Sequence, residues 1–324
     1  MNVQQEKIRA AGLSVVSNTF LILLKVAVGL AIGSVSILSE AVHSAVDLLA
    51  AGIALFSVRT SSIPADTRHP FGHGKVENLS GVVEALLIFL AAGWIIVEAV
   101  ERILHPRPLG YVTWGIAVML VSAAANYAVS ERLFRVGRAA DSVALTADAW
   151  HLRTDVYTSA GVMAGLGAIW LGNAFFPRLD LHWLDPAVAL AVALLILRAA
   201  WHLTLQSARD LMDVQLPESE EAWIREQIVA HRPVIHGFHR LRTRKAGNFR
   251  FVEFHIKVDP EMSVQVSHRI TEELTRAIEG HFPSASVTIH TEPCDGDCVG
   301  NCLTGCLLTE DRRRSVRDAQ RIAR

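Results

Sequence analysis

Long apolar runs dominate the first two thirds of the sequence, and a mixed pattern of shorter periods follows. Because the hydrocarbon core of a bilayer needs about 20 apolar residues per helix, the runs predict transmembrane helices. Six segments meet this length: residues 13–32, 36–58, 79–100, 112–129, 145–171 and 186–205. The second and fifth segments also carry ionisable residues within the apolar run.

After residue 216 the pattern predicts a small soluble domain. Residues 218–231 and 263–281 have helical periodicity, residues 249–258 alternate as a strand does, and 234–244 and 286–291 complete three strands. The expected fold class is therefore a six-helix membrane protein with a cytoplasmic α+β domain of metallochaperone-like αββαβ topology. The expected domains are residues 1–210 for transport, 211–293 for regulation and dimerisation, and 294–324 as a charged tail, helical or disordered.

Composition and charge agree with a membrane protein. The chain is 51% hydrophobic and 19% charged, below the charged fraction of about 25% in soluble domains. A net charge of −1 gives no reason to expect a nucleic-acid partner. The polar start lacks a cleavage site, so we expect an uncleaved first span. Basic residues, Lys7 among them, favour one side of the predicted bundle. The positive-inside rule then places both termini in the cytoplasm, and we expect a bacterial inner (plasma) membrane.

Two matching pairs of residues lie inside the predicted membrane segments. His43 and Asp47 are four residues apart on the second segment, and His151 and Asp155 on the fifth. Helical geometry places each pair on one face. If the faces meet, two imidazoles and two carboxylates form a four-coordinate site that suits zinc. The alternative is buried polar residues that hydrogen-bond between helices, but such residues in a membrane usually serve a pathway. Asp148 and Arg153 lie near the same pairs.

Two further clusters could bind metal. Asp66, His69 and His73 lie in the loop between the second and third segments, where a solvated turn with incidental histidines explains the spacing equally well. A second group falls on separate elements of the soluble domain, and its spacing alone is weak support. That group is His239, His255, His268, His290 and Glu292.

All four cysteines lie in the tail at a regular four-residue step: Cys294, Cys298, Cys302 and Cys306. A disulfide framework would distribute cysteines through the fold, so a metal-related or redox role is favoured. Intervening glycines argue for a flexible wrap around a soft metal ion. The alternative is a tail with inert thiols.

These motifs together resemble the cation diffusion facilitator family over residues 10–294. The resemblance rests on residues 33–38 and 43–47, on the Phe-Gly-His-Gly-Lys sequence of residues 71–75, and on residues 151–155, 241–244 and 290–293. It implies a homodimer in membrane lipid that exchanges cytoplasmic metal for protons by alternating access. It also implies a transport site at the membrane tetrad, a loop site at residues 66–73 and a two-metal site in the soluble domain. Lys75 and Asp213 match a salt bridge between protomers, whereas the cysteines match no family feature.

The expected function is therefore divalent metal efflux by proton antiport, with Zn²⁺ as the leading ion. The two histidines and two aspartates resemble the zinc-selective members, although cadmium, cobalt, iron and manganese stay open. One alternative is a membrane metal sensor that does not transport. The other is a membrane metalloenzyme, which would need an open coordination position beside a general base. No hydrolase motif such as HExxH occurs in the sequence, so we expect a transporter and not an enzyme.

Overall fold

The computed structural model describes residues 3–32, 35–105, 113–175, 184–296 and 301–323, and some helical side chains within these ranges are not described. The chain divides into two compact units, Met1–Leu211 and Met212–Arg324. The fold class matches the prediction: a helical membrane domain precedes a domain of helices and a small sheet.

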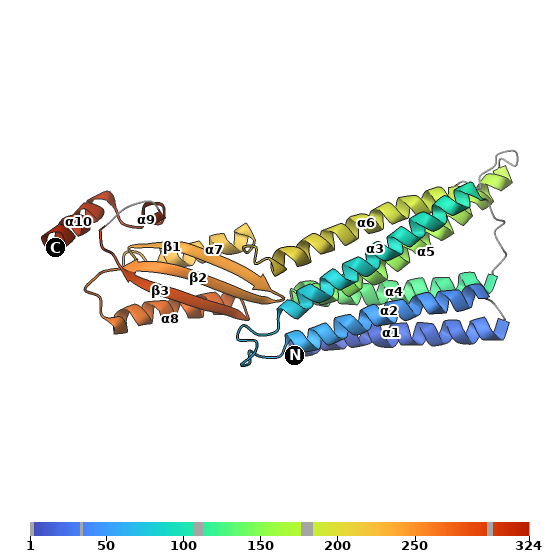
Figure 1. The fold of residues 1–324 in the computed structure, drawn as a ribbon, viewed down its shortest axis with the longest axis horizontal. Coiled ribbons are helices and arrows are strands. Elements are labelled where there is room, and N and C mark those ends of the chain that lie inside the picture. Colours follow the sequence, from blue (N-terminus) through green and yellow to red (C-terminus); the bar gives the residue numbers. More distant parts are fainter. Residues whose placement is uncertain (1–2, 33–34, 106–112, 176–183, 297–300, 324) are drawn as a thin grey trace. The chain divides into compact units, whose positions relative to one another are not determined.

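Six long helices make up the described part of the first unit (Figure 1). They correspond one to one with the six predicted segments. Their bounds are α1 Val3–Ile32, α2 Val35–Ser61, α3 Lys75–Leu104, α4 Thr113–Ala139, α5 Val143–Phe175 and α6 Leu184–Leu211. Several helices continue past the apolar run; α1, for example, begins ten residues before its predicted start at residue 13. The sequence pattern marks the apolar part of a helix, whereas backbone hydrogen bonds continue into polar turns.

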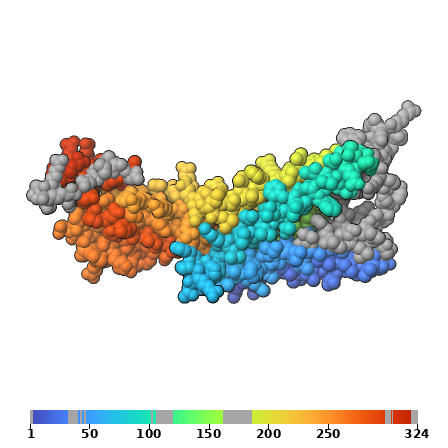
Figure 2. All heavy atoms as spheres, in the orientation of Figure 1, coloured from blue at the N-terminus to red at the C-terminus, as the bar shows by residue number. Residues whose placement is uncertain are grey.

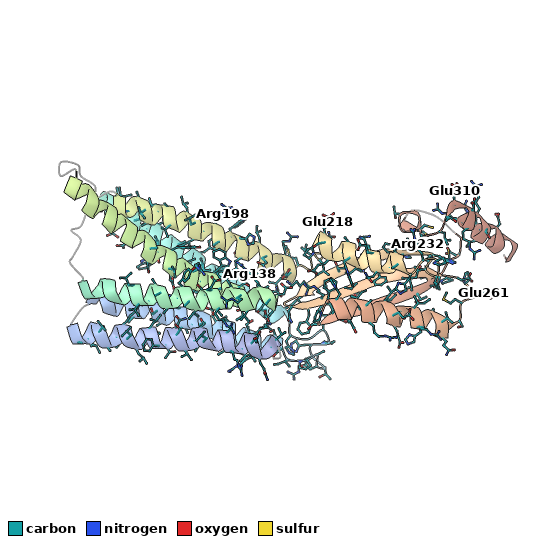
Figure 3. The ribbon with its side chains drawn as sticks, turned by 180° about the vertical axis from the view of Figure 1, so that it is seen from behind. Arg138, Arg198, Glu218, Arg232, Glu261 and Glu310 are labelled. Carbon is teal, nitrogen blue, oxygen red and sulfur yellow. The ribbon has the colours of Figure 1, made fainter. Side chains whose placement is uncertain are left out.

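By length and composition, three described helices could cross a membrane: Val3–Ala31 of α1, Lys75–Glu101 of α3 and Pro186–Leu211 of α6. In α2 and α5 the apolar run is interrupted by Asp47, Asp148 and Asp155. The outer faces of the helices suit lipid, since large apolar side chains such as Leu90 and Trp94 are 71% and 77% exposed. One charged side chain, Arg198 on α6, points away from the helices around it as well (Figure 3).

Small residues line the contacts between the helices. α3, α5 and α6 meet at a buried cluster that includes Ala85, Ala92, Ala147 and Ala200. Gly81 permits the closest approach, because a Cβ there would overlap the Ser207 hydroxyl and a methyl of Val143. Interfaces of small residues let helix backbones pack closely in lipid, where the hydrophobic effect supplies no driving force between helices.

A buried ion pair joins the helices at one end of the bundle. The carboxylate of Glu77 on α3 accepts hydrogen bonds from Lys7 on α1, Ser61 on α2 and Ser142 beside α5. Lys7 and Glu77 are 1% and 0% exposed. Lys7, one of the basic residues that favour one side of the predicted bundle, is therefore buried against this carboxylate.

The second unit has the predicted αββαβ order. Its elements are α7 Glu218–Ala230, β1 Gly237–Ala246, β2 Phe249–Val258, α8 Val264–His281 and β3 Ala285–Pro293. The sheet order is β1-β2-β3, with β1 antiparallel and β3 parallel to β2. Alternate residues of β2, such as Val252 and Phe254, join the isoleucines of α7 and α8 in one core. The opposite face of the sheet therefore presents His255 and Lys257.

The tail lies in the same compact unit as this sheet. It contains α9 Asn301–Thr304 and α10 Glu310–Ala323, so the described part of residues 312–324 is helical. Cys306 pairs with Gly237 at the start of β1 through an antiparallel bridge. In Figure 2 the red atoms of the tail rest against the orange atoms of the sheet domain.

Candidate metal centres

Three predicted ligands converge inside the helical unit. Asp47 on α2 and His151 and Asp155 on α5 each offer a ligand atom within 4.8 Å of the others. His151 Nε2 lies 3.2 Å from Asp47 Oδ1, and both side chains are about 4% exposed. The one-turn spacing of His151 and Asp155 aims both at α2. His43 lies one turn before Asp47 in α2, but its side chain is outside the described ones.

Two further polar residues of α5, Asp148 and Arg153, lie near this cluster but are placed differently. Asp148, one turn before His151, is fully buried. Arg153 instead points to α4, where its guanidinium donates to Ser130 and Glu131 and lies 4.5 Å from the ring centroid of Tyr127. An imidazole and two carboxylates in a buried site leave negative charge that a divalent cation would neutralise.

The loop between α2 and α3 brings its three candidate ligands together. Asp66 lies 3.3 Å from His69 and 3.6 Å from His73, and the ligand atoms of all three fall within 4.8 Å. The backbone amides of Arg68 and His69 donate to Asp66. The hydrogen bond from the His69 amide is the main cause that lowers the pKa of Asp66 below its ordinary value. Gly72 adopts a φ of +78°, which closes the turn in a conformation that favours glycine.

Strand register builds the third centre on the exposed face of the sheet. His239 on β1 pairs with His255 on β2, which pairs with His290 on β3, so three histidines lie side by side across the sheet. Glu292 lies two residues beyond His290 and therefore on the same face. Its carboxylate lies 2.6 Å from His255 Nδ1, 3.5 Å from His239 Nε2 and 3.8 Å from His290 Nε2.

Within the described residues, His239, His255 and Glu292 have ligand atoms within 4.8 Å of one another. His290 is 63% exposed at the edge of this group. The structure does not bring His268 to it: that side chain is 70% exposed on α8 and pairs with Glu272 on the same helix. A helix and the far sheet face lie on opposite sides of the core, and the spacing in the sequence could not show this.

The environment of the sheet centre favours the protonation states of His239 and Glu292 that bind metal. Burial lowers the pKa of His239 below its ordinary value, so its imidazole stays neutral to a lower pH than usual. Burial would raise the pKa of Glu292, but the His255 hydrogen bond and the charges of His239 and Lys257 outweigh it, and the net pKa is lowered. Lys257 Nζ, 3.4 Å from Glu292, is a neighbour that the sequence analysis did not single out. Its position two residues after His255 on one strand is the signal that could have found it.

The salt bridge between Lys75 of one protomer and Asp213 of another stays a prediction. The two residues belong to different units of the chain. Within its own unit, Lys75 Nζ lies 3.5 Å from the Leu211 carbonyl oxygen, and Asp213 accepts from Arg244 at 3.4 Å. Of the tail cysteines, Cys294 is buried, Cys302 and Cys306 are half-buried, and Cys298 lies outside the described residues.

Two family models cover most of the chain. The cation efflux transmembrane domain matches residues 12–212, and the cation efflux protein cytoplasmic domain matches residues 216–294. The chain belongs to the cation diffusion facilitator family. The predicted resemblance is therefore confirmed.

Known relatives match nearly the whole length. An uncharacterised transporter of Synechocystis is 38% identical over 81% of this chain and 83% of the relative. The cation-efflux pump FieF of Citrobacter koseri is 32% identical over 88% of this chain and 92% of the relative. A structure of the metal-bound C-terminal domain of the CzcD transporter from Thermotoga maritima is 32% identical, covers 24% of this chain and 94% of that chain, and has a TM-score of 0.21.

Membership of this family establishes the broad function. The protein is an integral membrane transporter for efflux of divalent metal cations, and it is not an enzyme, as predicted. The metal-ligand groups described above agree with that class of substrate.

Proposed function

We propose that this cation diffusion facilitator exports Zn²⁺ from the cytoplasm in exchange for protons. The observation that carries the proposal is the convergence of Asp47, His151 and Asp155 from two helices at one buried point. His43, one turn from Asp47, supplies the fourth ligand. Two nitrogen and two oxygen donors suit tetrahedral zinc, whereas calcium and magnesium prefer six or more oxygen ligands.

Proton exchange follows from the chemistry of these ligands. A histidine binds metal only when neutral and an aspartate only when ionised, so metal and protons compete for the same groups. Zn²⁺ that enters from the cytoplasm displaces protons, and protonation from the opposite side releases the ion. The competition couples the two fluxes, provided that the bound ion and the protons stabilise different conformations.

The other centres serve regulation and entry in this proposal. Zn²⁺ at His239, His255 and Glu292, with His290 at the edge, strengthens a homodimer. A Lys75–Asp213 ion pair between protomers adds to that dimer. Asp66, His69 and His73 form a second, exposed Zn²⁺ site. Both chain termini lie in the cytoplasm of a bacterial cell, in the inner membrane.

Zinc flux into proteoliposomes tests the proposal. Asp47→Asn and His151→Ala each remove a ligand, and we expect zinc transport and the coupled proton flux to fall to the level of protein-free liposomes. His202→Ala is the matched control, because His202 is an exposed histidine on α6. Zinc flux at the wild-type rate in either ligand variant would refute the proposal. Zinc flux without any proton flux in the wild type would refute the antiport step alone.

A further inference from the structure

A second type of candidate ligand gathers beside the His239–His255–Glu292 centre, where the tail meets the sheet. Three cysteines and two histidines line a small, partly open cavity of about 10 Å³, which is about the space of one water molecule. They are His236, His239, Cys294, Cys302 and Cys306, and His239 also belongs to the third centre described above. His236 directly precedes β1, Cys294 directly follows β3, and Cys302 lies in α9. The cavity is therefore where the tail folds back on the sheet.

His236 is the side chain that points to a ligand. It is 7% exposed, and its Nδ1 atom has no hydrogen-bond partner among the described residues. Its backbone is fixed, since its amide donates to the Lys257 carbonyl at 2.7 Å and its carbonyl accepts from Leu307 at 2.9 Å. Buried polar atoms in folded proteins normally have a partner, so a buried ring nitrogen without one is the position that a metal ion would fill.

The tail backbone is shaped to hold the cysteines at this place. A Cβ at Gly305 would overlap the Phe238 carbonyl oxygen, and the Gly305 carbonyl accepts from the Phe238 amide at 3.0 Å. Gly296 has a φ of +73°, and a Cβ there would lie 3.1 Å from the Arg317 Cα. Two of the glycines that suggested a flexible wrap, Gly296 and Gly305, thus mark close contacts of the tail.

We propose that His236, Cys294, Cys302 and Cys306 form a tetrahedral site for a thiophilic divalent cation, Zn²⁺ or Cd²⁺, that fastens the tail to the domain. A set of three cysteines and one histidine is a common structural zinc site. Each cysteine binds as a thiolate, so binding of one ion releases three thiol protons. The ion and three thiolates leave a net charge of −1, which Arg313 at the cavity wall offsets.

Binding also requires a movement of the tail cysteines. Among the described residues, the three centres above are the groups whose ligand atoms lie within 4.8 Å of one another, and the cysteines are not among them. The cation therefore draws Cys302 and Cys306 toward His236. This site adjoins the His239–His255–Glu292 centre, since His239 lines the same cavity, but it differs from that centre because its donors are mainly sulfur. The proposed cysteine site depends on neither zinc transport nor proton coupling.

Absorption spectroscopy with Cd²⁺ tests the proposal on the full chain in detergent. Thiolate–cadmium bonds give an ultraviolet charge-transfer band that histidine and carboxylate centres lack. We expect this band to saturate at one ion per protomer in the wild type and to be lost in the Cys294→Ser/Cys302→Ser/Cys306→Ser variant. His236→Gln should weaken binding at least tenfold, since loss of even an outer partner costs about 10–100-fold in affinity. Cys298→Ser, the matched control, should keep the band and its affinity. An unchanged band in the triple variant, or its loss in Cys298→Ser, would overturn the assignment.

A measurement on the unmodified protein guards against a variant that fails to fold. Alkylation by iodoacetamide, followed by mass spectrometry of tail peptides, reports each cysteine separately. One equivalent of Cd²⁺ should protect the half-buried Cys302 and Cys306 together and leave Cys298 reactive. Equal alkylation with and without Cd²⁺ would overturn the proposal even if the variants could not be purified.

Discussion

The buried Lys7–Glu77 pair gives a sharp prediction about what holds the helices together. Glu77 accepts from Lys7, Ser61 and Ser142, so one carboxylate on α3 bonds to groups from α1, α2 and the start of α5. Both charged groups are almost fully buried. Removal of one partner leaves the other charge buried without its counter-ion.

The expected magnitude follows from this burial. Loss of one partner of a buried ion pair costs about 3–5 kcal/mol. Lys7→Met and Glu77→Gln should therefore each destabilise the protein by about that amount. For folded units of 150–250 residues, about 2–4 °C of melting temperature corresponds to 1 kcal/mol, so each change should lower Tm by about 6–20 °C. The double variant leaves no unpaired charge, and it should be no less stable than either single variant.

Thermal unfolding of the detergent-solubilised protein, followed by size-exclusion chromatography of heated samples, measures all four members of the cycle. Arg59→Met is the matched control, because Arg59 is an exposed cation at the end of α2, and its Tm should stay within about 2 °C of the wild type. If the two single losses simply add in the double variant, the two groups do not act as a pair and the reasoning fails.

Three further predictions concern packing and the soluble unit. Gly81→Ala should cost about 1–3 kcal/mol, because its Cβ must displace Ser207 or Val143, and a Tm equal to that of the wild type would show that the interface is loose. His255→Ala should remove zinc from the soluble centre in equilibrium binding, whereas His268→Ala should retain it; the reverse result would contradict the assigned geometry. Zinc affinity at this centre should hold to a pH below the ordinary histidine pKa of about 6.5, because the pKa of His239 is lowered and protons compete less. A loss of zinc already above pH 6.5 would refute this.

Helix and strand order were predictable because each follows a local period. The apolar runs located six helices, and alternation in residues 249–258 located β2 and its buried face. The ends of helices were less predictable, because the polar turns at the start of α1 and at the end of α4 carry no apolar signal. Lys7 shows the consequence: it lies before the apolar run, and only the packing of distant segments reveals its partner Glu77.

How well each candidate metal centre could be predicted from the sequence depended on how far apart its ligands lie along the chain. One-turn spacing gave the shared face of His151 and Asp155 directly, since that is a property of one helix. The row of His239, His255 and His290 needed the register of three strands, which local sequence does not determine. His236 gave no signal in the sequence, because its role depends on a tail that returns to the sheet from 70 residues away.

X-ray absorption at the zinc edge tests most directly whether α2 and α5 share one cation. The measurement uses zinc-loaded full chain with Asp66→Ala, His255→Ala and Cys302→Ser, which weaken the other centres. We predict one zinc per protomer with only nitrogen and oxygen neighbours at about 2.0–2.2 Å, and loss of that zinc when Asp47→Asn and His151→Ala are added. Retention of the zinc with an unchanged spectrum would contradict the account.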